Sequence, residues 1–358
     1  MNSTLECIED YNLDKNLFPF VYIIVIVVSI PVNSTFLCVS CIQVRKKNEL
    51  AIYLFSLSLA DLLYTLTLPL WIDYTWHQDS WRFSALLCQI SAFLMYMNFY
   101  TSAAFLTCIS VDRYLALVHP LRFQHLRTSR FALLVSIFIW VLETSLNCMI
   151  LVKDETFTQV CNSTSHVLCY DKYPLEKWQG ILNIFRICSG YMIPLAIMLF
   201  CYQKIYQAVR HNQATEDREK KKIKKLLLSI TITFFFCFTP YHAVLLIRSI
   251  NEPNNVNFVH MFKPYRITQA LTSFNCIADP ILYCFVSETG RTDILNMLKR
   301  CFCVQKSELQ QPTDVTMTST IKKNSTAVTP KSSTDLERTA QHSKLVVSSK
   351  CSNAGLRT

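Results

Sequence analysis

The chain has 358 residues, of which 51% are hydrophobic and 17% are charged, and its formal net charge is +10. Its mean hydropathy is +0.25. These values are typical of an integral membrane protein and exclude an ordinary soluble domain. The positive charge indicates contact with anionic membrane lipid and a cytoplasmic protein, with no nucleic-acid partner. No metal motif, nucleophile elbow or phosphate loop is present, so we expect neither an enzyme nor a cofactor.

Seven apolar runs are long enough to cross about 30 Å of hydrocarbon. They lie at residues 18–42, 51–74, 86–112, 131–152, 180–207, 226–250 and 265–286. An isolated span must satisfy its backbone hydrogen bonds internally, which requires a helix. We therefore predict an all-α bundle of seven transmembrane helices over residues 18–287, after an N-terminal segment, 1–17. The first run follows a polar stretch and precedes basic residues and a second span, so we interpret it as a span and not as a signal peptide.

The loops indicate the orientation of the bundle. Basic residues collect after the first and third runs and between the fifth and sixth, namely Arg45, Lys46, Lys47, Arg122, Arg127, Arg130, Arg218, Lys220, Lys221, Lys222, Lys224 and Lys225. The positive-inside rule places these loops in the cytoplasm and the N-terminus outside, which predicts a multi-pass protein of the plasma membrane. The sequons at Asn2 and Asn162 would then face outside as glycosylation sites.

Most of the 16 cysteines lie within the apolar runs, where free cysteine behaves as a small hydrophobic residue. Among the outer cysteines, Cys88 heads the third run and Cys169 lies in the long loop before the fifth. We expect a bridge between these two. A second bridge between Cys7 and Cys161 stays open, because sequence does not fix connectivity.

The segment after the seventh run changes character. Residues 288–303 can form an amphipathic helix on the membrane surface, and Cys301 and Cys303 at its end are candidates for palmitoylation. Residues 304–358 are rich in Ser, Thr and Lys and poor in aromatic residues, which predicts a disordered, phosphorylatable cytoplasmic tail.

Several motifs agree in order and spacing with one family. They are Asn33, the run Leu57-Ser58-Leu59-Ala60-Asp61, Asp112-Arg113-Tyr114, Trp140, Pro194, Tyr202, the run Phe236-Cys237-Phe238-Thr239-Pro240, and Asn275-Cys276-Ile277-Ala278-Asp279-Pro280-Ile281-Leu282-Tyr283. Together they resemble the rhodopsin-like (class A) G-protein-coupled receptors from about residue 18 to 303. Residues 66–74, 93–100 and 169–178 resemble, more narrowly, the proton-sensing subfamily. This resemblance implies activation by extracellular protons and coupling through Gs to cyclic AMP.

Three carboxylic acids lie inside predicted spans, where an ionised group is costly and therefore a functional candidate. The resemblance assigns Asp61, Glu143 and Asp279 to a buried proton-sensing triad. Burial and like-charged neighbours can raise the pKa of a carboxyl group from about 3.9 to near neutrality. The class also implies a sodium site, formed by Asp61, Asn98, Ser102, Asn275 and Asp279. Alternatively, Glu143 is a lone protonated acid bonded to a neighbouring hydroxyl.

Histidine titrates near physiological pH without any perturbation. His242, two residues after Pro240, should face the bundle, and it resembles a sensing histidine of the subfamily. Residues 11–16 contain no histidine, whereas relatives carry some there. This difference puts the pH midpoint in doubt.

The resemblance also implies a switch for signal output. Arg113, which precedes Tyr114 in this motif, would pair with Asp112 at rest. On activation it would move toward Tyr202 and Tyr283. Pro240 kinks the sixth span because proline removes a helical hydrogen bond. Phe238 occupies a pivot position where tryptophan is more usual. An outward swing of the sixth span would admit the C-terminal helix of a Gα subunit.

A ligand pocket in the outer half is the last candidate site, with Tyr96, Phe99, Arg186, Arg248 and Arg266 as lining. The arginines could pair with acids such as Asp171 and Glu176, bind an anionic lipid, or extend to the membrane interface. The alternative function is therefore a class A receptor for a lysolipid, nucleotide or peptide that acid only modulates. A transporter is disfavoured, because no inverted repeat is visible.

Overall fold

The computed structural model describes residues 11–152, 156–161, 164–170, 174–211, 217–254 and 259–286. Several predicted features lie outside these ranges: both sequons, at Asn2 and Asn162, Cys7 of the second candidate bridge, the surface helix with Cys301 and Cys303, and the C-terminal tail. The predicted domain boundaries at residues 17, 287 and 303 therefore remain predictions.

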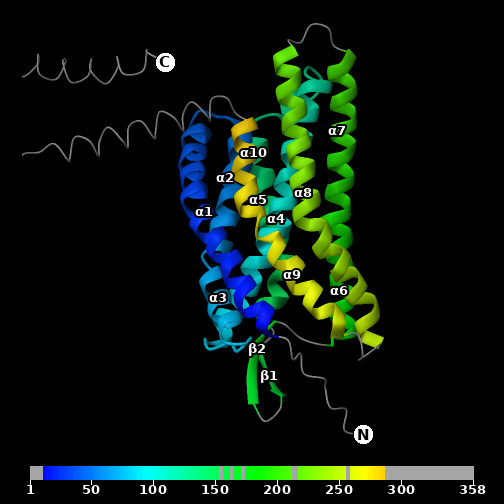
Figure 1. Ribbon diagram of the computed structural model, residues 1–358. Helices are drawn as coiled ribbons and strands as arrows, with labels where there is room; N and C mark the ends of the chain where they lie inside the picture. The colour runs from blue at the N-terminus through cyan, green and yellow to red at the C-terminus, as the bar shows by residue number, and fades with distance from the viewer. Residues whose placement is uncertain are drawn as a thin grey trace, which may run out of the picture. The chain divides into compact units, whose positions relative to one another are not determined.

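The described chain forms the predicted helical membrane bundle (Figure 1). The elements that cross the bundle are α1 (Tyr11–Arg45), α2 (Glu49–Thr65) with α3 (Leu68–Trp76), α4 (Ala85–Val118), α5 (Ser129–Val152), α6 (Lys177–Ile187) with α7 (Ile193–His211), α8 (Asp217–Asn251), and α9 (Phe262–Thr272) with α10 (Asn275–Val286). Six of these stretches are long and apolar enough to cross a membrane. The seventh predicted span is divided into α9 and α10.

Two of the long helices are interrupted, and identifiable features of the chain lie at each interruption. A π-helical turn, Cys188–Met192, joins α6 to α7. The gap between α9 and α10 is filled by polar contacts: the hydroxyls of Tyr64 and Ser273 lie 2.8 Å apart, and Asn33 Nδ2 donates to the carbonyl of Cys276 at 2.8 Å. Freed backbone groups inside a membrane need such partners. Short 3-10 turns occur at Gln124–Leu126, Glu252–Asn254 and Val259–Met261.

One small sheet accompanies the helices. Strands β1 (Thr156–Cys161) and β2 (Thr164–Cys169) pair antiparallel, with Thr156 opposite Cys169. A disulfide joins Cys169 to Cys88 near the start of α4, which confirms the predicted bridge. We call this the disulfide end of the bundle. The opposite end, where α4 carries Arg113, is called the Arg113 end.

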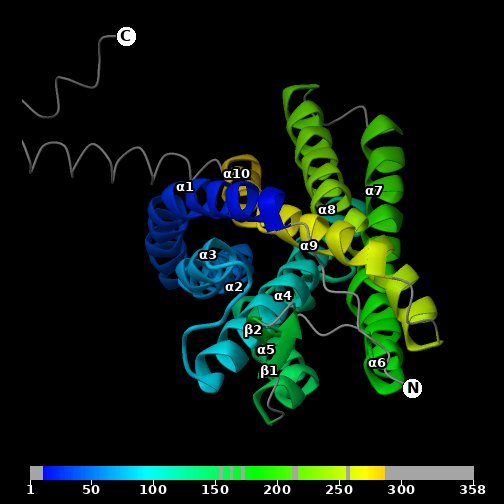
Figure 2. The same cartoon turned by 60° about the horizontal axis from the view of Figure 1, so that its bottom comes forward.

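Helix α4 lies at the centre of the bundle and packs against α2, α5 and α7 (Figure 2). Its middle third is almost fully buried, whereas outer faces of the surrounding helices expose large apolar side chains such as Phe138 and Val27. The polar side chains that are buried, such as Asp61 and Asn98, lie inside, and an apolar surface faces outward, as a bundle surrounded by lipid requires. Residues on α4 can therefore contact the candidate sites on α2, α5, α8 and α10.

Candidate functional site

Two of the three predicted acids lie together in the middle of the bundle. Asp61 on α2 is fully buried, and its Oδ1 accepts a hydrogen bond from Asn98 Nδ2 at 2.8 Å. Asn275 Nδ2 reaches Asn98 Oδ1 at 3.3 Å and Ser102 Oγ at 3.4 Å. Asp279 is buried on α10 within electrostatic range of Asp61.

This pair of carboxylates is short of partners. Asp61 Oδ2 and both carboxylate oxygens of Asp279 are buried without a hydrogen-bond partner in the described part of the chain. Two buried like charges cannot both stay ionised without compensation. The surrounding groups offer oxygen ligands, which suit a hard cation such as sodium, and the same oxygens are proton acceptors. The cluster can therefore be neutralised either by a proton or by a small cation.

The third acid lies elsewhere. Glu143 on α5 is partly buried, within electrostatic range of Arg186 and Tyr100. Asn147 links it to Arg186, because Asn147 Nδ2 donates to the Glu143 carbonyl at 2.9 Å and Asn147 Oδ1 accepts from Arg186 at 3.0 Å. Within the described residues, no interaction joins Glu143 to Asp61 or Asp279. The structure thus divides the predicted triad into a pair and a separate acid.

His242 on α8 lies inside an aromatic cage. It is 2% exposed, its Nδ1 lies 2.8 Å from the Phe238 carbonyl, and its Nε2 has no hydrogen-bond partner in the described structure. The rings around it are Tyr191 at 4.5 Å, Tyr241 at 5.1 Å, Tyr100 at 6.1 Å and Phe238 at 6.4 Å between centroids. The carbonyl contact requires a proton on Nδ1, which leaves Nε2 as the free proton acceptor.

Sequence reasoning missed Tyr100 and Tyr191, which connect the candidate sensors. Tyr100 contacts His242 and lies in range of Glu143. Gly190 makes this contact feasible, because a Cβ there would lie 2.3 Å from Tyr100 Cδ1. A glycine within an apolar span often marks such a close approach and was the available signal.

At the Arg113 end, Asp112 holds two guanidinium groups. Its Oδ2 accepts from Arg113 Nη2 at 2.7 Å, and its Oδ1 accepts from Arg127 Nε at 3.4 Å. Arg127 also donates to Glu49 at 3.1 Å, at the start of α2. Arg113 is therefore in the paired arrangement that the resemblance implies for the resting state, and Arg127 and Glu49 extend the predicted switch.

The other switch residues surround this network. Tyr114 lies 3.1 Å from His119 Nε2, and Tyr202 packs with Tyr114 against a buried cluster of Ile205, Val209 and Leu227. Phe238 and Pro240 lie further along α8, which continues through Pro240, and the Phe238 ring is part of the aromatic cage around His242. The side chain of Tyr283 lies outside the described residues.

Two of the outer arginines form buried ion pairs. Arg248 pairs with Glu252, and Arg266 pairs with Asp79. Glu176, one of the acids considered as a partner, forms a capping box with Gln179 at the start of α6. The proposed alternative Asp171 lies outside the described residues. Arg248 and Glu252 have the i, i+4 spacing that brings side chains together on a helix, whereas Asp79 and Arg266 are 187 positions apart and their pairing could not be read from the sequence.

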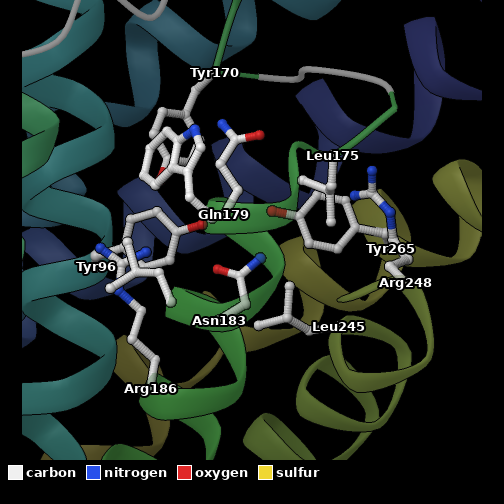
Figure 3. Close-up of a pocket in the computed structure, with 11 residues that line it drawn as sticks. Tyr96, Tyr170, Leu175, Gln179, Asn183, Arg186, Leu245, Arg248 and Tyr265 are labelled. Carbon is white, nitrogen blue, oxygen red and sulfur yellow. The ribbon is translucent and has the colours of Figure 1, made fainter. Parts of the chain in front are cut away.

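The predicted ligand pocket is small and divided. Tyr96, Arg186 and Arg248 line a cavity of about 30 Å³ between α4, α6 and α8 (Figure 3). Arg266 lines a second cavity of about 10 Å³, whereas Phe99 packs below Tyr96 against Tyr241. A volume of about 30 Å³ has room for roughly one or two water molecules. The described structure therefore has no cavity of ligand size among these residues.

Tyr170 closes the cavity from the disulfide end. Its backbone has a φ of 62°, which is uncommon for a residue other than glycine, and its ring meets Tyr96 at 5.4 Å. It directly follows the bridged Cys169, so the disulfide fixes its place. Burial raises the pKa of Tyr170 well above its ordinary value.

Comparison with known proteins agrees with this arrangement. Residues 32–283 match the family model described as 7 transmembrane receptor (rhodopsin family). The chain belongs to this family. A human relative, G-protein coupled receptor 65, is 63% identical over 311 residues, covering 84% of this chain and 91% of the relative. Human G-protein coupled receptor 68 is 40% identical over 84% of this chain and 81% of its own length.

A more distant receptor of the rhodopsin family is also similar. Mouse lysophosphatidic acid receptor 5 is 32% identical over 317 residues, covering 83% of this chain and 81% of the relative. The family consists of receptors and not of enzymes, so the prediction that the chain is not an enzyme is confirmed. The predicted resemblance to the subfamily of the two nearer relatives is confirmed as well.

Proposed function

We propose that this receptor is activated by extracellular protons, with the disulfide end outside the plasma membrane and the Arg113 end in the cytoplasm. One observation carries the proposal: three carboxylate oxygens of Asp61 and Asp279 and the Nε2 of His242 are buried without a hydrogen-bond partner among the residues that the structure describes. Each is a proton acceptor inside the bundle. The basic residues Arg45 and Lys47 at the Arg113 end support the orientation.

The size of the outer cavity supports a proton as the agonist. A bound organic ligand needs a pocket of roughly 300 Å³ or more, whereas a proton needs none. The competing proposal is a lysolipid receptor, which the 32% identity to a lysophosphatidic acid receptor favours. Arg248 and Arg266 could recognise a phosphate only after leaving Glu252 and Asp79. Breaking these buried ion pairs would cost free energy, so the lysolipid is the second candidate.

The proton response follows from linkage. Acid favours whichever arrangement of the receptor binds more protons. A shift of the population from mostly resting to mostly active takes about 5.5 kcal/mol. One group whose pKa differs by one unit between the two arrangements contributes about 1.4 kcal/mol. Several groups must therefore act together, and His242, Glu143 and the Asp61–Asp279 pair supply them. A sodium ion held by Asp61, Asn98, Ser102, Asn275 and Asp279 would compete with protons for the pair.

Output would pass through a heterotrimeric G protein at the Arg113 end. Release of Arg113 from Asp112 and a swing of α8 at Pro240 would open a groove for a Gα helix. Coupling to Gs and a rise in cyclic AMP are what the subfamily resemblance supports. Arrestin and receptor kinases at the tail, glycans at Asn2 and Asn162 and palmitoyl groups at Cys301 and Cys303 complete the proposal.

The proposal is tested by measuring cyclic AMP in cells that express the receptor. External pH is lowered from about 8 to about 6, the range in which histidine titrates. The variants Glu143→Gln and His242→Phe are measured in parallel, together with surface expression. A rise on acidification that these variants shift or abolish supports proton sensing. A flat response from a surface-expressed receptor that still couples to G proteins would sink it, and would favour the lysolipid reading.

A further inference from the structure

A hollow opens on the outer side of the bundle, and none of the candidate sensors lines it. Residues of α1, α2 and α5 enclose about 430 Å³ there, and we call this hollow the α1–α2–α5 groove. Phe55 and Ser56 of α2 contribute to its lining between the other two helices. Helix α2 packs against both α1 and α5 and so forms the floor between two walls.

The groove faces the hydrocarbon region and not the interior. Ile137, which lines it on α5, is 52% exposed at the outer surface of the bundle. Trp140 lies one turn further along α5 and also lines the groove. Both side chains belong to a stretch long and apolar enough to cross a membrane. The occupant must therefore come from the membrane and be largely apolar.

A polar side chain lies inside this apolar groove without a partner. Ser136 is 3% exposed, and its hydroxyl has no hydrogen-bond partner among the described residues. A buried helical serine in a membrane usually bonds to a carbonyl of its own helix, as Ser110 does with Leu106 on α4. Ser136 does not, although it lines the groove. Rotation about its Cα–Cβ bond would be needed to turn this buried hydroxyl toward an acceptor in the occupant.

The mouth of the groove is positively charged. Arg45 in the last turn of α1 lines it at the Arg113 end, and the exposed Lys47 follows closely. The nearest acid along the chain, Glu49, is engaged by Arg127. A cation beside an apolar slot suits an anionic head group attached to a hydrocarbon chain. A sterol offers neither a negative charge nor an ester carbonyl.

We infer that the α1–α2–α5 groove binds one phospholipid with an anionic head group. Arg45 would bind the phosphate, the Ser136 hydroxyl would donate to an ester carbonyl of the lipid, and the acyl chain would lie along Phe55, Ile137 and Trp140. The orientation proposed above places the mouth at the cytoplasmic leaflet, which is rich in anionic lipid. That point alone rests on the proposed function, and binding itself does not depend on proton sensing.

Native mass spectrometry of the full-length receptor tests this inference, after reconstitution with equal amounts of phosphatidylserine and phosphatidylcholine. Ile137→Trp fills the groove, whereas Leu134→Trp changes an equally lipid-facing residue of α5, 65% exposed, that does not line it. We expect one retained phosphatidylserine in the wild type and in Leu134→Trp, and none in Ile137→Trp. Arg45→Ala should weaken binding about fivefold.

Two further measurements keep the test decisive. Thermal melting identifies a variant that misfolds, and Ser136→Ala, a minimal change, should weaken binding without lowering the melting temperature. Equal retention in Ile137→Trp and Leu134→Trp overturns the inference. So does equal retention of phosphatidylcholine, or displacement of phosphatidylserine from the groove by added cholesterol, which would assign it to a sterol.

Discussion

Tyr191 stacks on His242, with ring centroids 4.5 Å apart and 10° between the ring planes. Tyr191 belongs to the π-helical turn before α7, and its hydroxyl lies 2.7 Å from Thr239 Oγ1 on α8. An imidazolium over an aromatic ring gains about 0.5–2 kcal/mol through the cation–π interaction. The stack therefore allows His242 to carry a charge inside the bundle, and it connects that charge to the helix before α7.

The first prediction concerns this stack. Tyr191→Leu removes the ring; for a stack that is kept in the active arrangement, a protonated His242 loses about 0.5–1 kcal/mol and the acid response should move to more acidic pH by about 0.4–0.7. Tyr191→Phe keeps the ring and should leave the midpoint in place. Dose–response curves of G-protein activation against external pH measure both. An unchanged midpoint in Tyr191→Leu, or an equal shift in Tyr191→Phe, would contradict the role of the ring.

The second prediction concerns Asp61 and Asp279. Their oxygens have no hydrogen-bond partner among the described residues except the one that accepts from Asn98, so a small cation could compensate the ionised pair. Replacing choline with sodium should then raise the melting temperature of the wild-type receptor. A sodium concentration ten times the Kd stabilises a folded protein by about 1.4 kcal/mol. Asp279→Asn should remove this dependence and raise signalling at alkaline pH, because asparagine resembles the protonated acid.

Asp73→Asn serves as the control, because Asp73 is a more exposed acid that lies beside His77 at the disulfide end. It should keep the sodium effect in full. If sodium stabilises Asp279→Asn as much as the wild type, the ion binds elsewhere and the proposed competition with protons is lost.

Sequence patterns were sufficient for the spans and for the bridge between Cys88 and Cys169. Apolar runs predict that a helix exists but not where it ends. Helix α4 continues beyond its apolar run to Val118, because polar residues of a helix can project beyond the hydrocarbon region. The division between α9 and α10 was not predictable. It depends on Asn33 and Tyr64, which come from other helices.

The candidate sensors illustrate the same limit. The type and span of Asp61, Glu143 and His242 followed from the sequence, whereas their grouping did not. Glu143 lies with Arg186 because α5 and α6 meet through Asn147, a contact between residues 39 positions apart. Contacts of this kind depend on helix rotation, which apolar periodicity leaves open in a bundle with lipid on one side.

The third prediction concerns the Arg113 end. Arg127 holds Asp112 and Glu49 together, so Arg127→Gln should loosen the resting arrangement. Partly exposed ion pairs contribute about 0.2–1 kcal/mol, which corresponds to a rise in basal signalling of about 1.4- to 5-fold. Glu49→Gln should give a smaller rise in the same direction. Basal G-protein activation at alkaline pH, normalised to surface expression, measures this, and the exposed Arg122→Gln is the control. A fall in basal signalling would show that Arg127 supports the active arrangement instead.

The fourth prediction concerns Asp79 and Arg266, which are both buried where the turn before α4 meets α9. Asp79→Asn leaves the guanidinium without its counter-charge, so we expect a loss of about 3–5 kcal/mol of stability. The matched change Asp73→Asn disturbs only an exposed cluster with His77 and Arg82 and should cost about 1 kcal/mol or less. Thermal melting in a membrane-mimetic medium compares the two. Equal losses would mean that the burial of the pair contributes nothing.

The fifth prediction is a pH response that should not change. Burial raises the pKa of Tyr170 well above its ordinary value, so its phenol stays protonated and neutral throughout the physiological range. A group that keeps its proton in both arrangements contributes nothing to the dependence of the equilibrium on pH. Tyr170→Phe should therefore keep the pH midpoint, although the lost hydroxyl can change the maximal response. His242→Phe, measured in the same cells, is the positive control. A midpoint shift of more than about 0.5 in Tyr170→Phe would mean that Tyr170 positions a titrating neighbour, with Arg186 and Glu143 as the groups to examine next.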